Sequence, residues 1–434
     1  MKLTLGFYRF LDTLFDDSIM YGIENKAFLD KLCAMLLALS PILQHYKGIY
    51  INAGLFVLIL LVPYLSLKLI LIIQNKSEDI YCVVALIPLV LFQLYKMVDH
   101  TISMGKVIYA AFIIVVFVAI ACGCVNIKYF IKCTTLISVA ASICLIAQYG
   151  CFYLFGFHLQ FVPTQFLLPE SSAWILGVKT GLFGINGEPN GFYRPSAFFL
   201  EPSHLFLYSF PVLCLLLLSP DINKKRKQCA VLVSTGMILS TSGMAVATTI
   251  GIWIVYYAFY NSKNNQTNIA RLKNMFSAKN LLILFLILIV LIIAFFEIEI
   301  FQNTVLRIFS TGDTGSSTAI EGRTRLARML VNGMSGKTLL VGVTENVNEI
   351  NFNLSGFYAT LYKYGVIGIV LSYLFYVLGV LRLKGSGFWI SLIIVIISFF
   401  TAHTHGTFYM LYYVIVIMNG YHIRNFYKKK VKSW

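Results

Sequence analysis

Charged side chains are scarce in this chain of 434 residues, at 12% of the composition. A soluble domain carries about 25% charged residues, so this chain lacks the means to cover itself with a water-facing surface. It also lacks any polar block long enough to fold as a separate domain. Short polar stretches instead separate apolar runs of about 16–24 residues, and a membrane helix needs about 20. The composition therefore excludes a soluble globular protein.

Several site signatures are missing as well. None of the nine cysteines has the spacing of a zinc or redox site, and Cys122-x-Cys124 is interpreted as a packing pair in an apolar helix end. The first 26 residues hold four acidic side chains and no long apolar core, so no secretory signal peptide is expected. The sequence predicts neither a metal nor another cofactor.

The apolar runs predict an all-α, polytopic membrane protein with about twelve transmembrane helices. A single integral membrane domain is expected over residues 1–434. The predicted spans are 27–43, 49–73, 80–95, 107–124, 129–150, 198–219, 229–241, 244–260, 281–296, 354–380, 388–402 and 407–420.

The excess of positive charge, 34 Lys and Arg against 18 Asp and Glu, orients these spans. With both termini in the cytoplasm, the inner segments hold about 21 basic residues and the outer segments about 10, as the positive-inside trend requires. This interpretation leaves nucleic acid out as a partner. It predicts two large periplasmic loops, 151–197 and 297–353, in a protein of the bacterial inner membrane.

The second loop keeps an arginine cluster on the outer side, with Arg323, Arg325 and Arg328 in a short amphipathic helix. Arg325 and Arg328 share one face, whereas Arg323 is about 140° from Arg328 by helical spacing. Basic residues resist export, so such a cluster indicates an anionic ligand such as pyrophosphate, which the planar guanidinium binds through paired hydrogen bonds. An interfacial helix that touches lipid phosphates is the alternative.

The first loop ends in Tyr193-Arg-Pro-Ser-Ala-Phe-Phe-Leu-Glu-Pro-Ser-His204, directly before an apolar span. Pro202 suits the first turn of a helix, and Glu201 would then lie at the helix N-terminus, where a carboxylate is favoured. This placement allows a purely structural, capped helix start. Glu201 and His204 would share a helix face, however, and ionisable groups at a membrane boundary are costly unless they are paired or used.

Two further polar segments lie between short spans. Thr401-Ala-His403-Thr-His405-Gly has two histidines, but no outer Cys or Asp cluster completes a metal site, and His403 is a candidate general base or a packing residue. The Ser240-Thr-Ser242 turn is expected to use its hydroxyls to satisfy backbone groups.

Together these features resemble the bacterial O-antigen polymerase family (Wzy-type), within the O-antigen ligase and polymerase group. The segment from Arg194 to Ser203 looks like the family's R-x-x-G/A-x-F-x-E-P-S motif, and the arginine cluster before Leu339-Leu-Val-Gly342 is a second match. The resemblance implies a membrane glycosyltransferase with GT-C-like architecture. It would join undecaprenyl-pyrophosphate-linked repeat units into O-antigen or a related surface polysaccharide at the periplasmic face of the membrane.

On this resemblance, Glu201, His204 and His403 are candidates for the catalytic base, and Arg194, Arg323, Arg325 and Arg328 would bind pyrophosphate. Tyr193, Phe198 and Phe199 are candidates for stacking on sugars. The expected partners are the lipid-linked glycan substrates, membrane lipid, a chain-length regulator and a flippase.

Two other functions stay open. An O-antigen ligase, which transfers glycan to the lipid A core, shares the fold and the donor, but the related ligases are expected to carry a His in the second loop, and 297–353 has none. A flippase for polyprenyl-linked glycans would need a charged central cavity and internal symmetry, and the sequence has few mid-span charges and no internal repeat.

Overall fold

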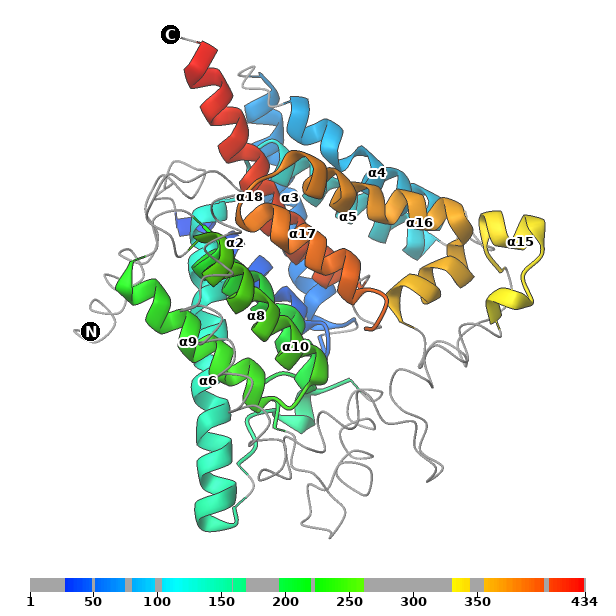
Figure 1. The fold of residues 1–434 in the computed structure, drawn as a ribbon. Helices are drawn as coiled ribbons and strands as arrows, with labels where there is room; N and C mark the ends of the chain where they lie inside the picture. Colours follow the sequence, from blue (N-terminus) through cyan, green and yellow to red (C-terminus); the bar gives the residue numbers. More distant parts are fainter. Residues whose placement is uncertain are drawn as a thin grey trace. The chain divides into compact units, whose positions relative to one another are not determined.

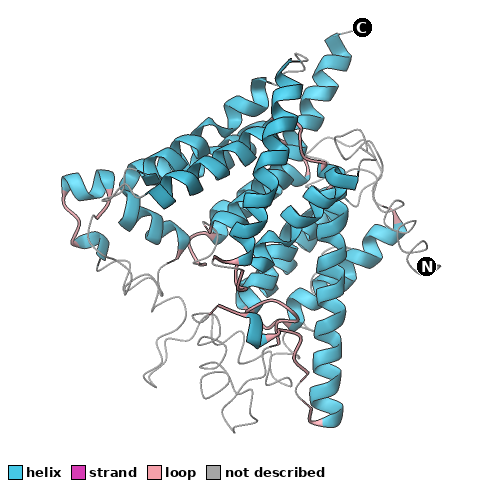
Figure 2. Ribbon diagram, turned by 180° about the vertical axis from the view of Figure 1, so that it is seen from behind, coloured by secondary structure: helices cyan, strands magenta, loops and turns pink. Residues whose placement is uncertain are grey.

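A computed structural model describes most of the chain, namely residues 28–48, 51–74, 80–97, 104–157, 159–168, 195–219, 223–260, 330–343, 355–401 and 406–432. Within these residues the protein is mostly α-helical, and the only strand-like pairing is two isolated β-bridges (Figure 2). The prediction of an all-α protein is confirmed.

The helices follow one another as Figure 1 labels them. Their bounds are α2 (Phe28–Leu43), α3 (Ala53–Gln74), α4 (Ile80–Met97), α5 (Met104–Ala121), α6 (Ile127–Phe155), the 3₁₀ turn η1 (Thr164–Phe166), α8 (Pro202–Leu217), α9 (Lys224–Leu239), α10 (Gly243–Val255), the π-helical turn η3 (Tyr256–Tyr260), α15 (Gly336–Val341), α16 (Gly356–Arg382), α17 (Ser386–Ile397) and α18 (Thr407–Lys432).

Each predicted span that falls on described residues coincides with one of these helices, and the ninth, 281–296, lies outside them. Four of the described helices, α3, α5, α6 and α16, are long and apolar enough to cross a membrane. Helices α4, α8, α10 and α17 are apolar but shorter. The chain is therefore a helical membrane protein, whereas the count of twelve spans stays a prediction.

Two helices extend into charged segments beyond the apolar runs that predicted them. Helix α9 begins at Lys224 rather than at 229, and α18 continues to Lys432 rather than ending at 420. Both extensions are rich in Lys and Arg, which are good helix formers and end an apolar run without ending a helix. Hydropathy alone therefore placed these two helix ends wrongly.

The described helices group into two compact units. Unit 1 contains residues 1–137, 163–173 and 323–434, and unit 2 contains residues 138–162 and 174–322. The prediction of one membrane domain over the whole chain stays a prediction.

Unit 2 is built around α8, in which every residue except Ser203 is buried. Helices α8, α9 and α10 lie side by side (Figure 1). Arg226 of α9 is fully buried and donates from Nη2 to the Leu215 carbonyl at 2.7 Å, which satisfies an acceptor in the last turn of α8. Gly236 of α9 packs so closely on α6 that an added Cβ would lie 2.7 Å from Cβ of Ser142, the close approach that small residues allow in membrane helices.

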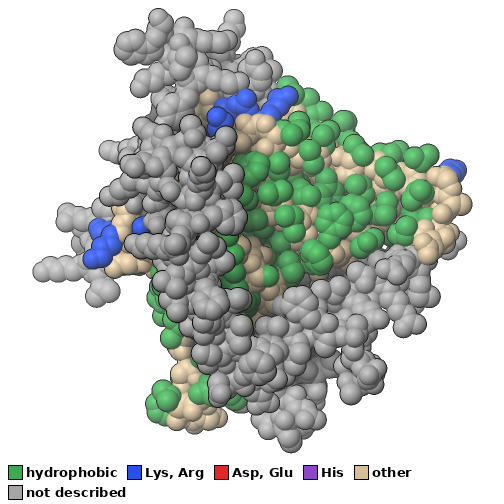
Figure 3. All heavy atoms as spheres, viewed as in Figure 1, with side chains coloured by type: hydrophobic (Ala, Val, Ile, Leu, Met, Phe, Trp, Pro, Cys, Tyr) green, Lys and Arg blue, Asp and Glu red, His purple; other side chains and the backbone are tan. Residues whose placement is uncertain are grey.

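Unit 1 is built around α18, whose residues Phe408–Met418 are all buried. This helix lies against α2, α4, α5 and α17. Hydrophobic side chains cover the outer face formed by α16 and α17 (Figure 3), as expected of helices that meet lipid. The buried carboxylate of Asp30 accepts hydrogen bonds from the Tyr64 hydroxyl at 2.6 Å and from the Lys68 ammonium group, so the charge is paired.

Candidate functional site

Two of the predicted site residues, Glu201 and His204, belong to the described part of the chain, and both lie at the start of α8 in unit 2. The others lie outside the described residues. They are Tyr193, Arg194, Arg323, Arg325, Arg328 and His403.

The prediction that Glu201 and His204 share a helix face is confirmed. His204 Nε2 lies 3.6 Å from Glu201 Oε1, the geometry of an i, i+3 pair. The Ser203 hydroxyl also donates to this carboxylate oxygen. Two neighbouring side chains on α8 therefore fix the orientation of the carboxylate.

The expectation of a capped helix start is confirmed only for the backbone. Glu201 has the extended conformation of an N-cap residue, and Pro202 begins the helix. Its backbone carbonyl accepts from the amides of His204 and Leu205 at 3.1 and 3.3 Å. Its side chain, however, makes no capping hydrogen bond. The carboxylate instead engages Ser203 and His204, so the helix start alone does not account for a glutamate here.

The two ionisable side chains differ in exposure. The Glu201 side chain is 23% exposed, whereas the His204 side chain is 2% exposed. A group that exchanges a proton with a substrate must reach it. The carboxylate meets this requirement, and the imidazole is placed to support it from within unit 2.

A tight turn leads into Glu201. Ala197 has a φ of 54°, in the left-handed region that residues other than Gly, Asn and Asp seldom adopt. The Ser196 hydroxyl donates to the Phe199 carbonyl at 2.7 Å, and the Phe199 amide donates to the Ser196 carbonyl at 3.0 Å. In the motif that this segment resembles, the position of Ala197 is Gly or Ala, the two residues with the smallest side chains.

Gln148, near the end of α6, is a positioning residue that the sequence analysis missed. Its side-chain oxygen accepts from the Ala197 amide at 2.9 Å, and its amide nitrogen donates to the Leu159 carbonyl at 3.0 Å. The Gln148 side chain is buried. Its two hydrogen bonds therefore satisfy a backbone amide and a backbone carbonyl, groups that are costly to leave unpaired away from water. The available signal was a side-chain amide near the end of a predicted span.

The two aromatic residues shortly before Glu201, Phe198 and Phe199, differ in exposure. Phe199 is buried and packs against Tyr208 of α8, with 5.3 Å between ring centroids. The interpretation of Phe199 as a sugar-stacking residue is therefore wrong, because its ring belongs to the core. Phe198 is half-buried and stacks on Phe199 at 5.2 Å, so it is the described aromatic residue of this turn that a ligand could still meet.

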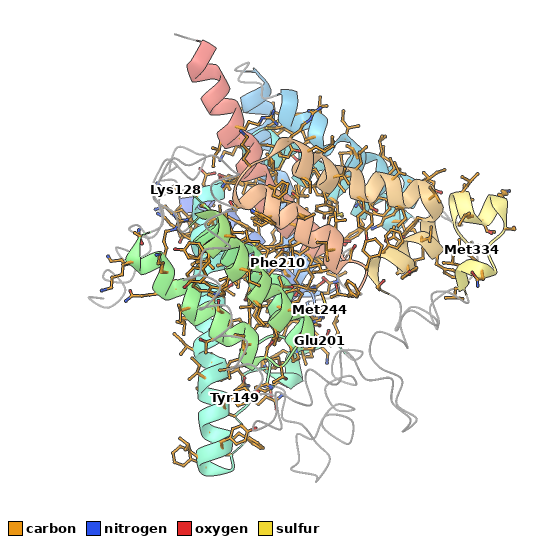
Figure 4. The ribbon with its side chains drawn as sticks, in the orientation of Figure 1. Lys128, Tyr149, Glu201, Phe210, Met244 and Met334 are labelled. Carbon is orange, nitrogen blue, oxygen red and sulfur yellow. The ribbon has the colours of Figure 1, made fainter. Side chains whose placement is uncertain are left out.

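The turn between α9 and α10 lies at the same end of unit 2. Figure 4 labels Glu201 before α8 and Met244, the second residue of α10, while Phe210 lies further along α8. The Ser240 hydroxyl donates to the Met237 carbonyl at 2.7 Å, and the Thr241 hydroxyl donates to the Ser240 carbonyl at 2.7 Å. The expectation that these hydroxyls satisfy backbone groups is confirmed. This turn is structural.

In unit 1, the residues before His403 are tied to the start of α16. The Gly356 amide donates to the Thr401 carbonyl at 2.6 Å, and the Phe357 amide donates to the Ser398 carbonyl at 2.9 Å. Phe357 also stacks on Phe399, with 4.4 Å between centroids. The segment that leads to His403 is thus anchored to a helix, although His403 itself lies outside the described residues.

The described site therefore consists of an oriented, partly exposed carboxylate, a buried imidazole beside it, and a strained turn held by Gln148. This arrangement can accept a proton from an approaching hydroxyl. No family model, curated protein or solved structure matches the chain.

Proposed function

We propose that this protein is a membrane glycosyltransferase that joins oligosaccharide repeat units carried on undecaprenyl pyrophosphate into a surface polysaccharide, O-antigen or a related polymer. One observation carries the proposal. The motif that resembles the O-antigen polymerases contains a carboxylate, that of Glu201, which accepts from Ser203, lies 3.6 Å from His204 and is 23% exposed. A merely structural glutamate at this position would cap the helix, and this one does not.

In the proposed reaction, a hydroxyl oxygen on the terminal sugar of one lipid-linked unit attacks the anomeric carbon of the growing chain. The bond between that carbon and the pyrophosphate oxygen breaks, and the bonding electrons leave with undecaprenyl pyrophosphate. The proton of the attacking hydroxyl passes to a general base. The leaving group is already a stable anion, so the protein's main task is to neutralise its charge.

We assign the base to Glu201 and a positioning role to His204, since the carboxylate is exposed and the imidazole is buried. Arg194 precedes the turn that Gln148 holds, and it is the first candidate for the pyrophosphate. Arg323, Arg325 and Arg328 are further candidates from the sequence. Tyr193 is a candidate sugar contact, and His403 is an alternative base.

The proposal includes the predicted topology. Glu201 and the loops 151–197 and 297–353 would face the periplasm, and both termini the cytoplasm, as the distribution of Lys and Arg requires. The substrate partners are then the lipid-linked units delivered by a flippase, and a chain-length regulator would act beside the enzyme.

The experiment that tests this function uses a deletion strain complemented with the full-length chain. We expect the deletion to leave a single repeat unit on the core, visible as the loss of the ladder on a glycan gel. Arg194→Ala should fail to restore the ladder while still reaching the membrane, and Arg194→Lys should restore it poorly because a bidentate contact is lost.

Arg382→Ala is the matched control. Arg382 ends α16 on the predicted inner side and is exposed, so its removal should restore the ladder fully. Long polymer that accumulates on the lipid carrier without reaching the core would instead identify a ligase. A full ladder with Arg194→Ala would refute the proposed pyrophosphate contact.

A further inference from the structure

Helix α6 ends in a short hydrogen-bonded lobe, residues 149–157, which we call the α6 lobe. Gly156 has a φ of 63°, and its amide donates to the Phe152 carbonyl at 3.0 Å, as in the αL cap that ends many helices. The Phe157 amide donates to the Cys151 carbonyl at 3.1 Å. These bonds end the helix and turn the chain back directly after it.

The α6 lobe exposes large apolar side chains, which Figure 3 shows at this end of α6. Four of them are between 54% and 78% exposed, namely Tyr153, Leu154, Phe155 and Phe157. The Tyr149 ring stacks on the Tyr153 ring, with 5.8 Å between centroids and 5° between the ring planes. An exposed apolar patch of this kind is a contact surface for lipid or for another protein.

The sequence around the lobe carries no charge. No Lys, Arg, Asp or Glu occurs between Lys132 and Glu170. A segment that extended into water would be expected to carry charged side chains, because about a quarter of the residues of a soluble protein are charged. Tyr149 and Tyr153 have the apolar body and polar tip that suit the boundary between hydrocarbon and water. The composition therefore favours the headgroup layer of a membrane over water.

The length of α6 indicates the depth of the lobe. Its 29 residues extend for about 44 Å, whereas the hydrocarbon core of a bilayer is about 30 Å thick. Figure 4 labels Lys128, whose charge suits one headgroup layer, and Phe155 follows it on α6 by about 40 Å, or about 38 Å at a common tilt of about 20°. A bilayer with its headgroups is about 40–45 Å thick. A helix that begins in one headgroup layer therefore ends in the other.

The exposed face of α6 is continuous with the lobe. Ile143 and Ile146 are exposed, and they precede Tyr153 by helical spacings that keep all three on one face. An exposed isoleucine within a membrane-spanning segment faces lipid. The same face continues to the end of the helix, so lipid is the partner that the patch on the lobe fits best.

Gln148 connects the lobe to the turn before Glu201. Its side-chain nitrogen donates to the Leu159 carbonyl at 3.0 Å, and its side-chain oxygen accepts from the Ala197 amide at 2.9 Å. One buried side chain thus closes the lobe and holds the turn. Because both bonds come from the same residue of α6, the depth of the lobe determines the depth of the turn.

We propose that the α6 lobe inserts into the headgroup layer of the membrane and, through Gln148, fixes the depth of the turn before Glu201. The exposed rings contact lipid at the level where amphipathic aromatic side chains gather. A lipid-linked substrate would carry its phosphate groups at this same level. The inference does not rest on the proposed glycosyltransferase activity, and its test does not measure that activity.

The test uses the full-length protein in phosphatidylcholine nanodiscs with the substitution Phe155→trifluoromethyl-phenylalanine, which gives one fluorine signal. Three paramagnetic probes are compared by how much they broaden it: a nitroxide on the lipid headgroup, a nitroxide near the end of the acyl chain, and a nickel chelate in water. We expect the headgroup nitroxide to broaden the signal most. Strongest broadening by the acyl-chain nitroxide would place the lobe in hydrocarbon, and strongest broadening by nickel would place it in water. Either result would overturn the proposal.

Ile146→trifluoromethyl-phenylalanine is the matched control. Ile146 lies on the exposed face of the same helix, about 13 Å before Phe155. The acyl-chain nitroxide should broaden this signal most. If the signals at the two positions responded alike, α6 would not cross from hydrocarbon into headgroups between them, and the proposed depth would be wrong.

A second label tests the coupling through Gln148. Fluorine placed by Phe198→trifluoromethyl-phenylalanine, in the turn before Glu201, should also be broadened by the headgroup nitroxide. Tyr153→Ser with Phe157→Ser removes two exposed rings of the lobe and should abolish this broadening. Phe157→Ser alone is the milder variant if the double variant does not fold. Unchanged broadening at Phe198 in the folded variant would overturn the coupling.

Val231→Ser with Ile254→Ser is the control for this pair. Both residues are exposed and apolar and belong to α9 and α10 of the same unit, so broadening at Phe198 should stay as in the wild type. An equal loss in the control would mean that any exposed apolar side chain sets the depth, and it would overturn the role of the lobe. A dimer in native mass spectrometry that the lobe variant dissociates would assign the patch to a second copy of the chain and overturn lipid as its partner.

Discussion

Helices α8 and α16 have similarly apolar sequences, yet they are used in opposite ways. Helix α8 has 16 residues, begins with Pro202 and is buried on all sides. Helix α16 has 27 residues, is broken at Gly365 and leaves a stripe of large apolar side chains exposed, up to 74% at Leu381. Helix α8 thus lies in the core of the protein, whereas α16 has the exposed apolar face expected of a helix that contacts lipid.

The difference shows where each helix can carry polar groups. A helix buried on all sides can hold a carboxylate only at its end, where Glu201 accepts from Ser203 and lies beside His204. A lipid-facing helix can carry a polar residue where its backbone turns, as with Lys363 beside the Gly365 break. The start of α8 therefore suits proton chemistry, which the lipid-facing length of α16 does not.

The largest effect is expected when the carboxylate at the start of α8 is removed. Glu201→Gln keeps the size of the side chain and an acceptor for Ser203, but it loses the basic oxygen. We expect polymerisation in a membrane assay with purified lipid-linked repeat units to fall by about 100-fold or more, the usual contribution of a general base. Thermal melting should stay close to that of the wild type, because α8 remains buried.

His204→Gln tests the other half of the same pair. If His204 only orients the carboxylate, its removal should reduce the rate less than Glu201→Gln does and should shift the pH at which the rate is half-maximal. An equal loss of rate in the two variants, with no change in the pH profile, would contradict the assignment of Glu201 as the base.

Much of this comparison could be predicted from the sequence. The apolar runs located α3, α8 and α16 because burial in lipid or in protein requires the same side chains. The spacing of Glu201 and His204 predicted their shared face because three residues nearly complete a helical turn. These features depend on residues close together in the chain.

The features that the sequence did not predict depend on contacts between distant segments and on backbone conformation. Gln148 and Ala197 are 49 positions apart, and nothing local in either segment indicates their hydrogen bond. The break at Gly365 follows from its contact with Leu340, and many glycines in apolar helices cause no break. Hydropathy also could not separate α8 from a lipid-facing span, because both kinds of helix are apolar.

A smaller effect is expected at the break of α16. Gly365→Ala places a Cβ 2.2 Å from the Leu340 carbonyl oxygen at a φ of 63°, so either α15 must move or the helix must straighten. We expect a destabilisation of about 2–5 kcal/mol, the sum of the left-handed cost and of overpacking. Denaturant unfolding in nanodiscs would measure it.

Gly105→Ala is the control for this change. Gly105 lies in the first turn of α5, in the same unit, and an added Cβ there would meet nothing within 4 Å. Alanine is the better helix former by about 1 kcal/mol, so this variant should be as stable as the wild type or more so. Equal destabilisation by both substitutions would mean that the protein tolerates no added methyl group, and the contrast between the two glycines would fail.

The smallest effect is expected at the turn before α8, and it has the opposite sign. Ala197 adopts a φ of 54°, which costs an L-residue about 1–2 kcal/mol, and Ala197→Gly removes this cost. Glycine also gains about 0.5–1 kcal/mol of freedom in the unfolded chain, so the net stabilisation should be about 0.5 kcal/mol. The backbone amide at position 197 can still donate to Gln148 in this variant, and polymerisation should be unchanged. Ala197→Val keeps the strain and adds a branched side chain at a buried position, so it should destabilise the protein. A destabilising Ala197→Gly would show that the methyl group packs more favourably than the backbone is strained.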